Sequence, residues 1–160
     1  MVQAVFPVSA PVINPALGSD LSGVSDLDPT MAEVSGRLCL SQNLARRLIT
    51  PRGTLIDDPN YGYDLTQYLN ADIGPSDIAQ IQAGVEAEFL KDERVLDATI
   101  VAQFVGPTQV QAALTATIAN PQPVPLGVLI ITATVTDSTG PFTLVLSVSN
   151  VTVTLLAVSV

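Results

Sequence analysis

The spacing of apolar residues along this chain changes near residue 94, from the period of a helix to that of a strand. Between residues 75 and 91, apolar side chains recur every three or four positions, as on the buried face of an amphipathic helix. These residues are Ile78, Ile81, Val85 and Phe89. After Arg94, apolar and polar residues alternate, as in strands that bury one face. The pattern therefore predicts helices first and strands afterwards.

The helical part is expected to contain about three helices. They span about residues 41–49, 64–70 and 75–91. Ser41 and Asp64 are residue types that favour the N-terminus of a helix, and Pro75 is suited to the first helical turn. The polar residues between the apolar positions of the longest helix should face mostly outward. They are Gln80, Gln82, Glu86 and Glu88.

The strand-rich part begins at about residue 94. Strands are expected near residues 96–104, 110–119, 129–136, 142–148 and 151–155. The segment Asp137–Pro141 has the composition of a hairpin turn between two of them. Because the helices precede the strands rather than alternating with them, the sequence predicts an α+β fold with a mostly antiparallel sheet.

The first 29 residues differ from the rest of the chain. They contain Pro7, Pro11 and Pro15 and show no sustained periodicity. Their apolar content is high for a solvated tail, so we expect an extended N-terminal arm that docks on a neighbour or on the chain's own surface; a frayed terminus is the alternative. The predicted organisation is an arm over residues 1–29 and a single domain over residues 30–160.

The composition is acidic and lacks several catalytic residue types. The 160 residues include 15 acidic and 6 basic ones, for a net charge of −9. This balance argues against a nucleic-acid or anionic-membrane partner, because the chain cannot neutralise many phosphates. Histidine is absent and Cys39 is the single cysteine, which excludes Ser-His-Asp triads, Cys-His pairs and metal sites built on these residues. We therefore expect no cofactor.

No targeting segment is apparent in the sequence. The N-terminus lacks the basic stretch and apolar core of a signal peptide. The longest apolar run, Val128–Ile131, is too short to cross a bilayer. We expect a soluble protein made in the cytoplasm.

Charge is distributed unevenly along the chain. From Ala98 to Val160 the only charged residue is Asp137. A sheet that met water on one face would normally carry lysine and glutamate there, partly to prevent pairing at its edges. This half of the chain therefore has the composition of strands that neighbouring subunits cover.

The segment Leu44–Leu65 is expected to form a loop of defined shape between two helices. It contains Pro51, Gly53 and Pro59, residues that restrict the backbone or permit a positive φ. Such a loop is typical of a rigid recognition surface, and Arg52 lies at its first turn.

Two tyrosines and one arginine near this loop have alternative interpretations. Tyr61 and Tyr63 flank Gly62 and so share a side in extended backbone; they either pack on the following helix or anchor a protein interface. Arg94 either complements the end of the long helix or pairs bidentately with a carboxylate, its own or a partner's.

Paired carboxylates are the one catalytic device that the composition allows. Asp92 with Glu93 and Asp57 with Asp58 could serve as acid and base in a cell-wall hydrolase. The chain has no tryptophan and three tyrosines, which is few for a sugar-binding cleft. Adjacent acids in turns are usually solvated, so we predict no catalytic residues and retain the hydrolase as the alternative.

Two motifs together resemble the baseplate wedge and sheath-initiator family of contractile phage tails and related injection machines. The first is the helix, Thr-Pro-Arg-Gly turn and Pro-x-Tyr-Gly segment within Leu44–Leu65. The second is Asp92-Glu93-Arg94-Val95 after the long helix, where the family commonly has Glu-Pro-Arg. The resemblance covers about residues 34–156.

The resemblance implies a structural, non-enzymatic component of the tail baseplate in the virion, assembled in the host cytoplasm. Such a domain would dock the first sheath ring by strand exchange, with a segment of one subunit added to the sheet edge of another. Implied partners are the tail sheath protein and baseplate wedge proteins, with tube and spike or hub proteins as further candidates. The expected partner-binding residues are Arg52, Tyr61, Tyr63, Asp92 and Arg94. A fibre or spike accessory with trimerising C-terminal strands is a third possibility.

Overall fold

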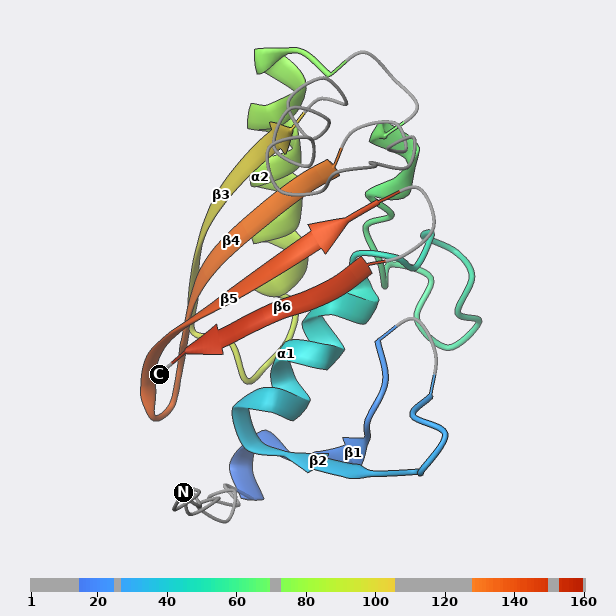
Figure 1. Ribbon diagram of the computed structural model, residues 1–160, viewed down its shortest axis with the longest axis vertical. Coiled ribbons are helices and arrows are strands. Elements are labelled where there is room, and N and C mark those ends of the chain that lie inside the picture. Colours follow the sequence, from blue (N-terminus) through green and yellow to red (C-terminus); the bar gives the residue numbers. More distant parts are fainter. Residues whose placement is uncertain (1–14, 25–26, 70–72, 106–127, 150–152, 160) are drawn as a thin grey trace, which may run out of the picture.

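The fold combines two helices with a four-stranded antiparallel sheet (Figure 1). The computed structural model describes residues 15–24, 27–69, 73–105, 128–149 and 153–159. In these residues the helices are α1 (Gly36–Arg47) and α2 (Pro75–Phe89), with 3-10 turns η1 (Pro15–Leu17) and η2 (Thr66–Tyr68). The strands are β1 (Ser19–Leu21), β2 (Glu33–Ser35), β3 (Asp97–Val105), β4 (Val128–Asp137), β5 (Gly140–Val148) and β6 (Val153–Ser159). The predicted α+β class and antiparallel sheet are confirmed.

The large sheet follows the order of the sequence, β3-β4-β5-β6, with every neighbouring pair antiparallel. Asp137 pairs with Gly140 at the end of β4, so a two-residue turn joins β4 to β5, as the hairpin prediction required. A register shift in the β5–β6 pairing leaves Leu156 without a partner residue, which is a β-bulge. The strand predicted at 110–119 lies outside the described residues.

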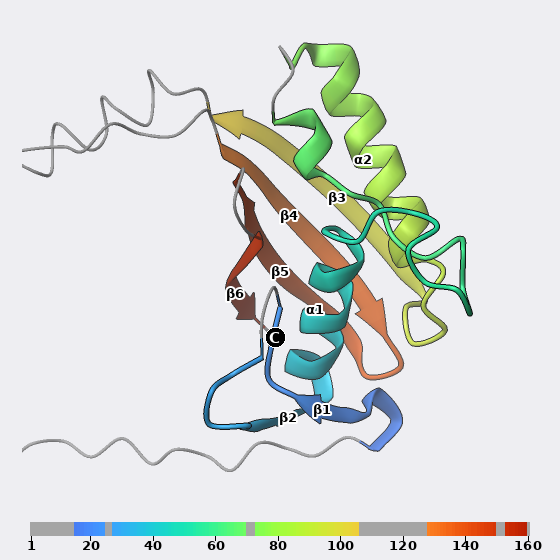
Figure 2. The ribbon, with the colours of Figure 1, turned by 90° about the vertical axis from the view of Figure 1, so that its right-hand side faces the viewer.

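Both helices cover the same face of the sheet, and one hydrophobic core fills the layer between them (Figure 2). The strands bury alternate residues toward this layer, including Ile131, Leu144 and Leu146 at 0% exposure. Leu44 of α1 and Phe89 of α2 are buried against them. The alternation of the sequence after residue 94 is therefore the alternation between this core and the opposite face.

The helix predicted at 41–49 begins earlier, at Gly36. Gly36 has φ +64°, which lets the chain turn directly from β2 into the helix. Ser41 is not the N-cap; it lies inside the helix, where its hydroxyl donates to the carbonyl of Arg37. Ser35 occupies the N-cap position.

The helix predicted at 64–70 is reduced to the 3-10 turn η2. The carboxylate of Asp64 accepts hydrogen bonds from the Thr66 N–H, at 2.9 Å, and from the Thr66 hydroxyl. These local hydrogen bonds satisfy the polar groups of the backbone in a turn, so they favour a turn over a longer helix. The third predicted helix is correct in outline, because α2 starts at Pro75 and Asp77 reaches back to the N–H of Gly74.

The described part of the predicted arm packs on the chain's own domain. Leu17 is buried in the core, and β1 pairs with β2 just before α1. The carbonyl of Gly18 accepts a hydrogen bond from Gly36, the first residue of that helix. Residues 1–14 of the arm lie outside the described residues.

Candidate functional site

The loop between α1 and η2 is anchored by a buried glutamate. Glu88 lies near the end of α2 and is 0% exposed. The sequence pattern placed it with the polar residues of the helix that face outward. That prediction was wrong. Glu88 faces the loop instead, and three basic side chains surround its carboxylate.

The carboxylate of Glu88 binds cations from three parts of the chain. The Nζ of Lys91 lies 2.6 Å from Oε2, and the guanidinium of Arg47 lies 3.2 Å from Oε1. Arg52, on the loop, approaches Oε2 at 3.4 Å. A buried carboxylate would be costly on its own, but here each oxygen is compensated by charge-assisted bonds. We refer to Glu88, Arg47, Arg52, Lys91 and the N–H of Gly62 as the Glu88 cluster.

The cluster also binds the loop backbone. The N–H of Gly62 donates to Oε1 of Glu88 at 2.9 Å, and the Nε of Arg52 donates to the carbonyl of Gly62 at 2.9 Å. Lys91 donates to the carbonyl of Asn60 at 2.7 Å. Gly62 has φ +101°, and a Cβ there would lie 2.1 Å from the carbonyl oxygen of Thr50, so only glycine fits.

The returning end of the loop caps helix α1. The N–H groups of Tyr63 and Leu65 donate to the carbonyls of Arg47 and Leu48, at 2.7 and 2.9 Å. The hydroxyl of Thr50 donates to the carbonyl of Arg46 at 2.8 Å. Carbonyls that the end of a helix would leave unsatisfied are thus bonded by the loop. The loop has a defined shape, as its proline and glycine residues predicted.

The electrostatics of the cluster favour an ionised glutamate. Burial on its own would raise the pKa of Glu88, but the hydrogen bonds from Lys91 and Gly62 outweigh it and hold the pKa below its ordinary value. The same balance of burial against hydrogen bonds from Arg94 lowers the pKa of Asp92. Both groups therefore act as charged acceptors.

Asp92 and Arg94 form a bidentate pair at the corner between α2 and β3. The Nε and Nη2 atoms of Arg94 lie 2.8 and 2.7 Å from the two carboxylate oxygens of Asp92. The Nη1 atom of Arg94 donates to the carbonyl of Leu17 at 3.0 Å. Arg94 thus binds the chain's own carboxylate and fastens the described end of the arm to this corner.

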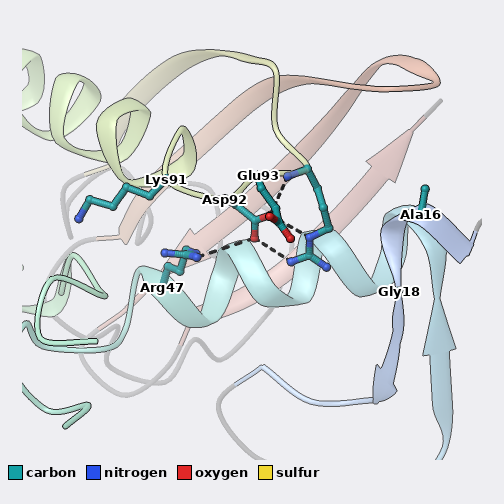
Figure 3. Close-up of a pocket in the computed structure, with 7 residues that line it drawn as sticks. Ala16, Gly18, Arg47, Lys91, Asp92 and Glu93 are labelled. Atoms are coloured by element: carbon teal, nitrogen blue, oxygen red, sulfur yellow. Dashed lines mark hydrogen bonds and ion pairs between the residues drawn. The ribbon is translucent and has the colours of Figure 1, made fainter. Parts of the chain in front are cut away.

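Arg47 joins this corner to the loop. Its Nη2 atom lies 3.8 Å from Asp92, and Figure 3 shows Asp92 reaching toward it while Lys91 points away. The carbon at the centre of its guanidinium lies 4.4 Å from the ring centre of Tyr61, a cation–π contact. Arg47 is therefore shared among Glu88, Asp92 and Tyr61.

Tyr63 packs on helix α2 through a gap that a glycine provides. A Cβ at Gly84 would lie 2.3 Å from the ring of Tyr63. The Tyr63 hydroxyl is 2.8 Å from that of Tyr68, and burial followed by this bond raises the pKa of Tyr63. The contact with Tyr68, in η2, agrees with the interpretation that Tyr63 packs on the segment after Asp64, whereas its packing on α2 was not expected.

The structure brings all five residues expected to bind partners into one connected network. They are Arg52, Tyr61, Tyr63, Asp92 and Arg94. Sequence reasoning missed the residues that connect them, Glu88 and Arg47 above all. One signal could have identified Glu88, because it lies three positions after Val85 and seven after Ile81, a spacing that places it on the apolar face of the helix.

A pocket lies beside the network. A pocket of about 460 Å³ is lined by Ala16, Gly18, Arg47, Lys91, Asp92, Glu93 and Arg94 (Figure 3). Arg47, Lys91, Asp92 and Arg94 of this lining take part in ion pairs, whereas Glu93 is exposed. In the described ranges, no three His, Cys, Asp or Glu side chains group as metal ligands would, and no helix is long and apolar enough to span a membrane.

Comparisons of the chain with models of protein families, with curated proteins and with solved structures found no match.

Proposed function

We propose that this chain is a structural baseplate component of a contractile tail, which docks the first ring of sheath subunits by strand exchange and links it to the baseplate wedge. It has no catalytic turnover in this proposal. Its partners are the tail sheath protein and baseplate wedge proteins. The proposal joins the resemblance of two motifs to one structural observation, which concerns the edges of the sheet.

The sheet ends in two edge strands that carry few of the charged residues and prolines that usually prevent pairing. Among the described strands, β3 pairs with β4 alone and β6 with β5 alone. β3 has nine residues with a single charge, Asp97, at its start, and β6 has no charged residue or proline. Exposed edges usually carry lysine, proline or other interruptions, because their free N–H and C=O groups attract another strand. Edges without them favour addition of a partner's strand.

The face of the sheet that points away from the helices also carries few charged residues. Most of its residues are threonine, serine and apolar side chains, with Asp97 and Gln103 on β3 as exceptions; Val101 is 47% and Leu156 56% exposed. The bulge at Leu156 interrupts β6, so β3 is the more regular of the two edges. We therefore assign the incoming strand to β3.

Carboxylate-dependent hydrolysis, the alternative from the sequence, gains no support from the three buried carboxylates. A glycosidase acid needs a raised pKa, whereas Glu88, Asp92 and Asp137 have lowered ones, since hydrogen bonds to cations and backbone overcome the effect of burial. Zymography directly distinguishes a structural protein from a cell-wall hydrolase. Clearing of cell wall by the purified chain that is lost with Glu93→Gln would replace our proposal with this one.

The test of strand exchange places a charge on the β3 edge. Val101→Lys adds a lysine to an outward position there, and Ala79→Lys adds the same charge to an exposed position on α2. Both variants should remain folded, as circular dichroism would show. We expect Val101→Lys to be excluded from assembled tails and Ala79→Lys to be incorporated. Equal incorporation of both would contradict pairing at β3.

A further inference from the structure

The 51–63 loop carries two exposed apolar residues at its far end. Ile56 is 94% exposed and Leu55 is 43% exposed, and every residue from Pro51 to Asn60 is exposed. The loop stands out from the body of the fold in both views (Figures 1 and 2). We refer to residues 55–58, Leu-Ile-Asp-Asp, as the loop tip.

The tip is held at both ends, although nothing in the described chain covers it. Across its base, the N–H of Gly53 donates to the carbonyl of Pro59 at 3.0 Å. A turn follows, in which the N–H of Tyr61 donates to the carbonyl of Asp58 at 3.1 Å. Below this, the Glu88 cluster binds the carbonyl of Asn60 and both backbone groups of Gly62. An apolar side chain on a fixed loop loses little further conformational freedom when a partner buries it.

Exposed isoleucines are ordinary on protein surfaces when they are scattered singly. Here one is almost fully exposed, a leucine precedes it, and a buried ionic cluster fixes the loop that carries both. The arrangement matches a binding anchor, in which a preorganised apolar side chain enters a partner's pocket.

The charges of the chain indicate what kind of partner this is. All six basic residues are ion-paired with four of the chain's own carboxylates. The 15 acidic residues include Asp57 and Asp58, directly after Ile56. A second copy of this chain would offer no uncommitted cation to the tip, and an anionic lipid surface would repel it.

We infer that the loop tip is a docking site for a different protein, with Ile56 inserted into an apolar pocket that has arginine or lysine at its rim. Leu55 covers the side of that pocket, and Asp57 faces the basic rim. Arg52, Tyr61 and Tyr63 then act beneath the tip, by fixing the loop rather than by touching the partner.

This inference rests on the proposed function, because the partner is sought within the assembled tail. A photo-crosslinking amino acid is placed at residue 56, or at residue 79 on α2 as the control, and tails are purified and irradiated. We expect residue 56 to crosslink to another tail protein, at a peptide containing apolar residues and arginine or lysine. Residue 79 should give no such product.

A competition experiment measures the contribution of the side chain. Unaltered chain and an Ile56→Asp variant are supplied in equal amounts, and their ratio in assembled tails is determined. We expect the variant to be under-represented about thirtyfold, as for an interface anchor. Ile56→Leu, which keeps an apolar side chain, should compete nearly as well as the unaltered chain. Asp57→Asn should lose about twofold to fivefold, the usual contribution of a charge at an interface rim.

The outcomes separate the two proposals. If the chain is present in tails but residue 56 crosslinks no more than residue 79, or Ile56→Asp competes equally, the docking inference is wrong and the proposed function stands. A crosslink to a second copy of this chain also overturns it. If the chain is absent from tails, the proposed function fails and the inference fails with it.

Discussion

The loop region and the sheet are stabilised in different ways. Between Arg37 and Arg94 lie all six basic residues, and four of them meet around Glu88 and Asp92. The strands after Ala98 contain one charge, Asp137, and are held by backbone ladders and apolar packing. Apolar burial is non-directional and contributes most of the free energy of folding. Charge-assisted bonds contribute less net free energy but fix direction.

The two regions also differ in what determines their shape and their contacts. The sheet forms the stable body, yet little in its composition prevents its edges from pairing with another chain. The loop is bound to that body through one buried carboxylate, so its shape depends on a few ionic contacts. Changes in the sheet should therefore lower global stability, whereas changes in the Glu88 cluster should act mainly on the loop.

The largest effect is expected from a cavity in the sheet. Leu144 of β5 is 0% exposed, so Leu144→Ala should lower the free energy of unfolding by about 4 kcal/mol. Urea unfolding followed by circular dichroism measures this change. Amide exchange should increase in the helices and the sheet together, because the loss is global. An increase confined to β5 would contradict the single core.

The second effect comes from removal of Glu88. Glu88→Ala leaves Arg47, Arg52 and Lys91 facing one another without their carboxylate, and it should cost about 3 kcal/mol. The estimate is at the low end for a broken buried pair, since Arg52 is 55% exposed and can return to water. Glu86→Ala, at an exposed position on the same helix, is the matched control and should change stability little.

Amide exchange distinguishes this variant from the cavity in the sheet. In Glu88→Ala the amide of Gly62 loses its acceptor and should exchange much faster, while amides of β4 and β5 keep most of their relative protection. Uniform loss of protection across the chain would mean that the cluster supports the whole fold and not the loop.

Much of this fold could be predicted from the sequence, because periodic burial leaves a periodic pattern. Helix α2 and the buried face of the strands follow from the spacing of apolar residues, and the β4–β5 hairpin follows from the composition of its turn. The start of α1 could not be predicted in this way, since Ser41 has the residue type of an N-cap but lies in the helix interior. The turn that begins at Gly36 depends on its positive φ, which the sequence does not state.

The candidate site was predictable only in part, for a related reason. Tyrosine and arginine often bind partners, so the sequence predicts that role for them, whereas the structure shows them in contact with the chain itself. Glu88, which accepts hydrogen bonds from Arg47, Arg52 and Lys91, belongs by type to a solvated helix face. It is buried because the loop returns to it from 26 residues away. Contacts between residues so distant in sequence leave no local pattern.

A smaller effect is expected from pH. The pKa of Glu88 is lower in the folded chain than its ordinary value of 4.5, because the bonds from Lys91 and Gly62 outweigh burial. The folded state therefore binds fewer protons, and the contribution of Glu88 is present above about pH 4.5 and lost as the pH falls through the lower folded value. Stability should thus decline on acidification, and less steeply in Glu88→Gln. Leu144→Ala should keep the slope of the unaltered chain, since it removes no titrating group.

The smallest effect is expected from Arg52, the most exposed member of the cluster. Its contact with Glu88 is long, at 3.4 Å, so Arg52→Ala should lower stability by about 1 kcal/mol or less. The hydrogen bond from its Nε to the Gly62 carbonyl orients the loop, and the loss of this orientation is not reflected in the small change in global stability. Arg52→Lys keeps the charge but lacks the planar guanidinium that bonds Glu88 and the Gly62 carbonyl together. Compared with Arg52→Ala, it should therefore recover more of the global stability than of the loop's protection from amide exchange. If lysine restores both equally, charge alone holds this side of the loop and the orienting role of the guanidinium is wrong.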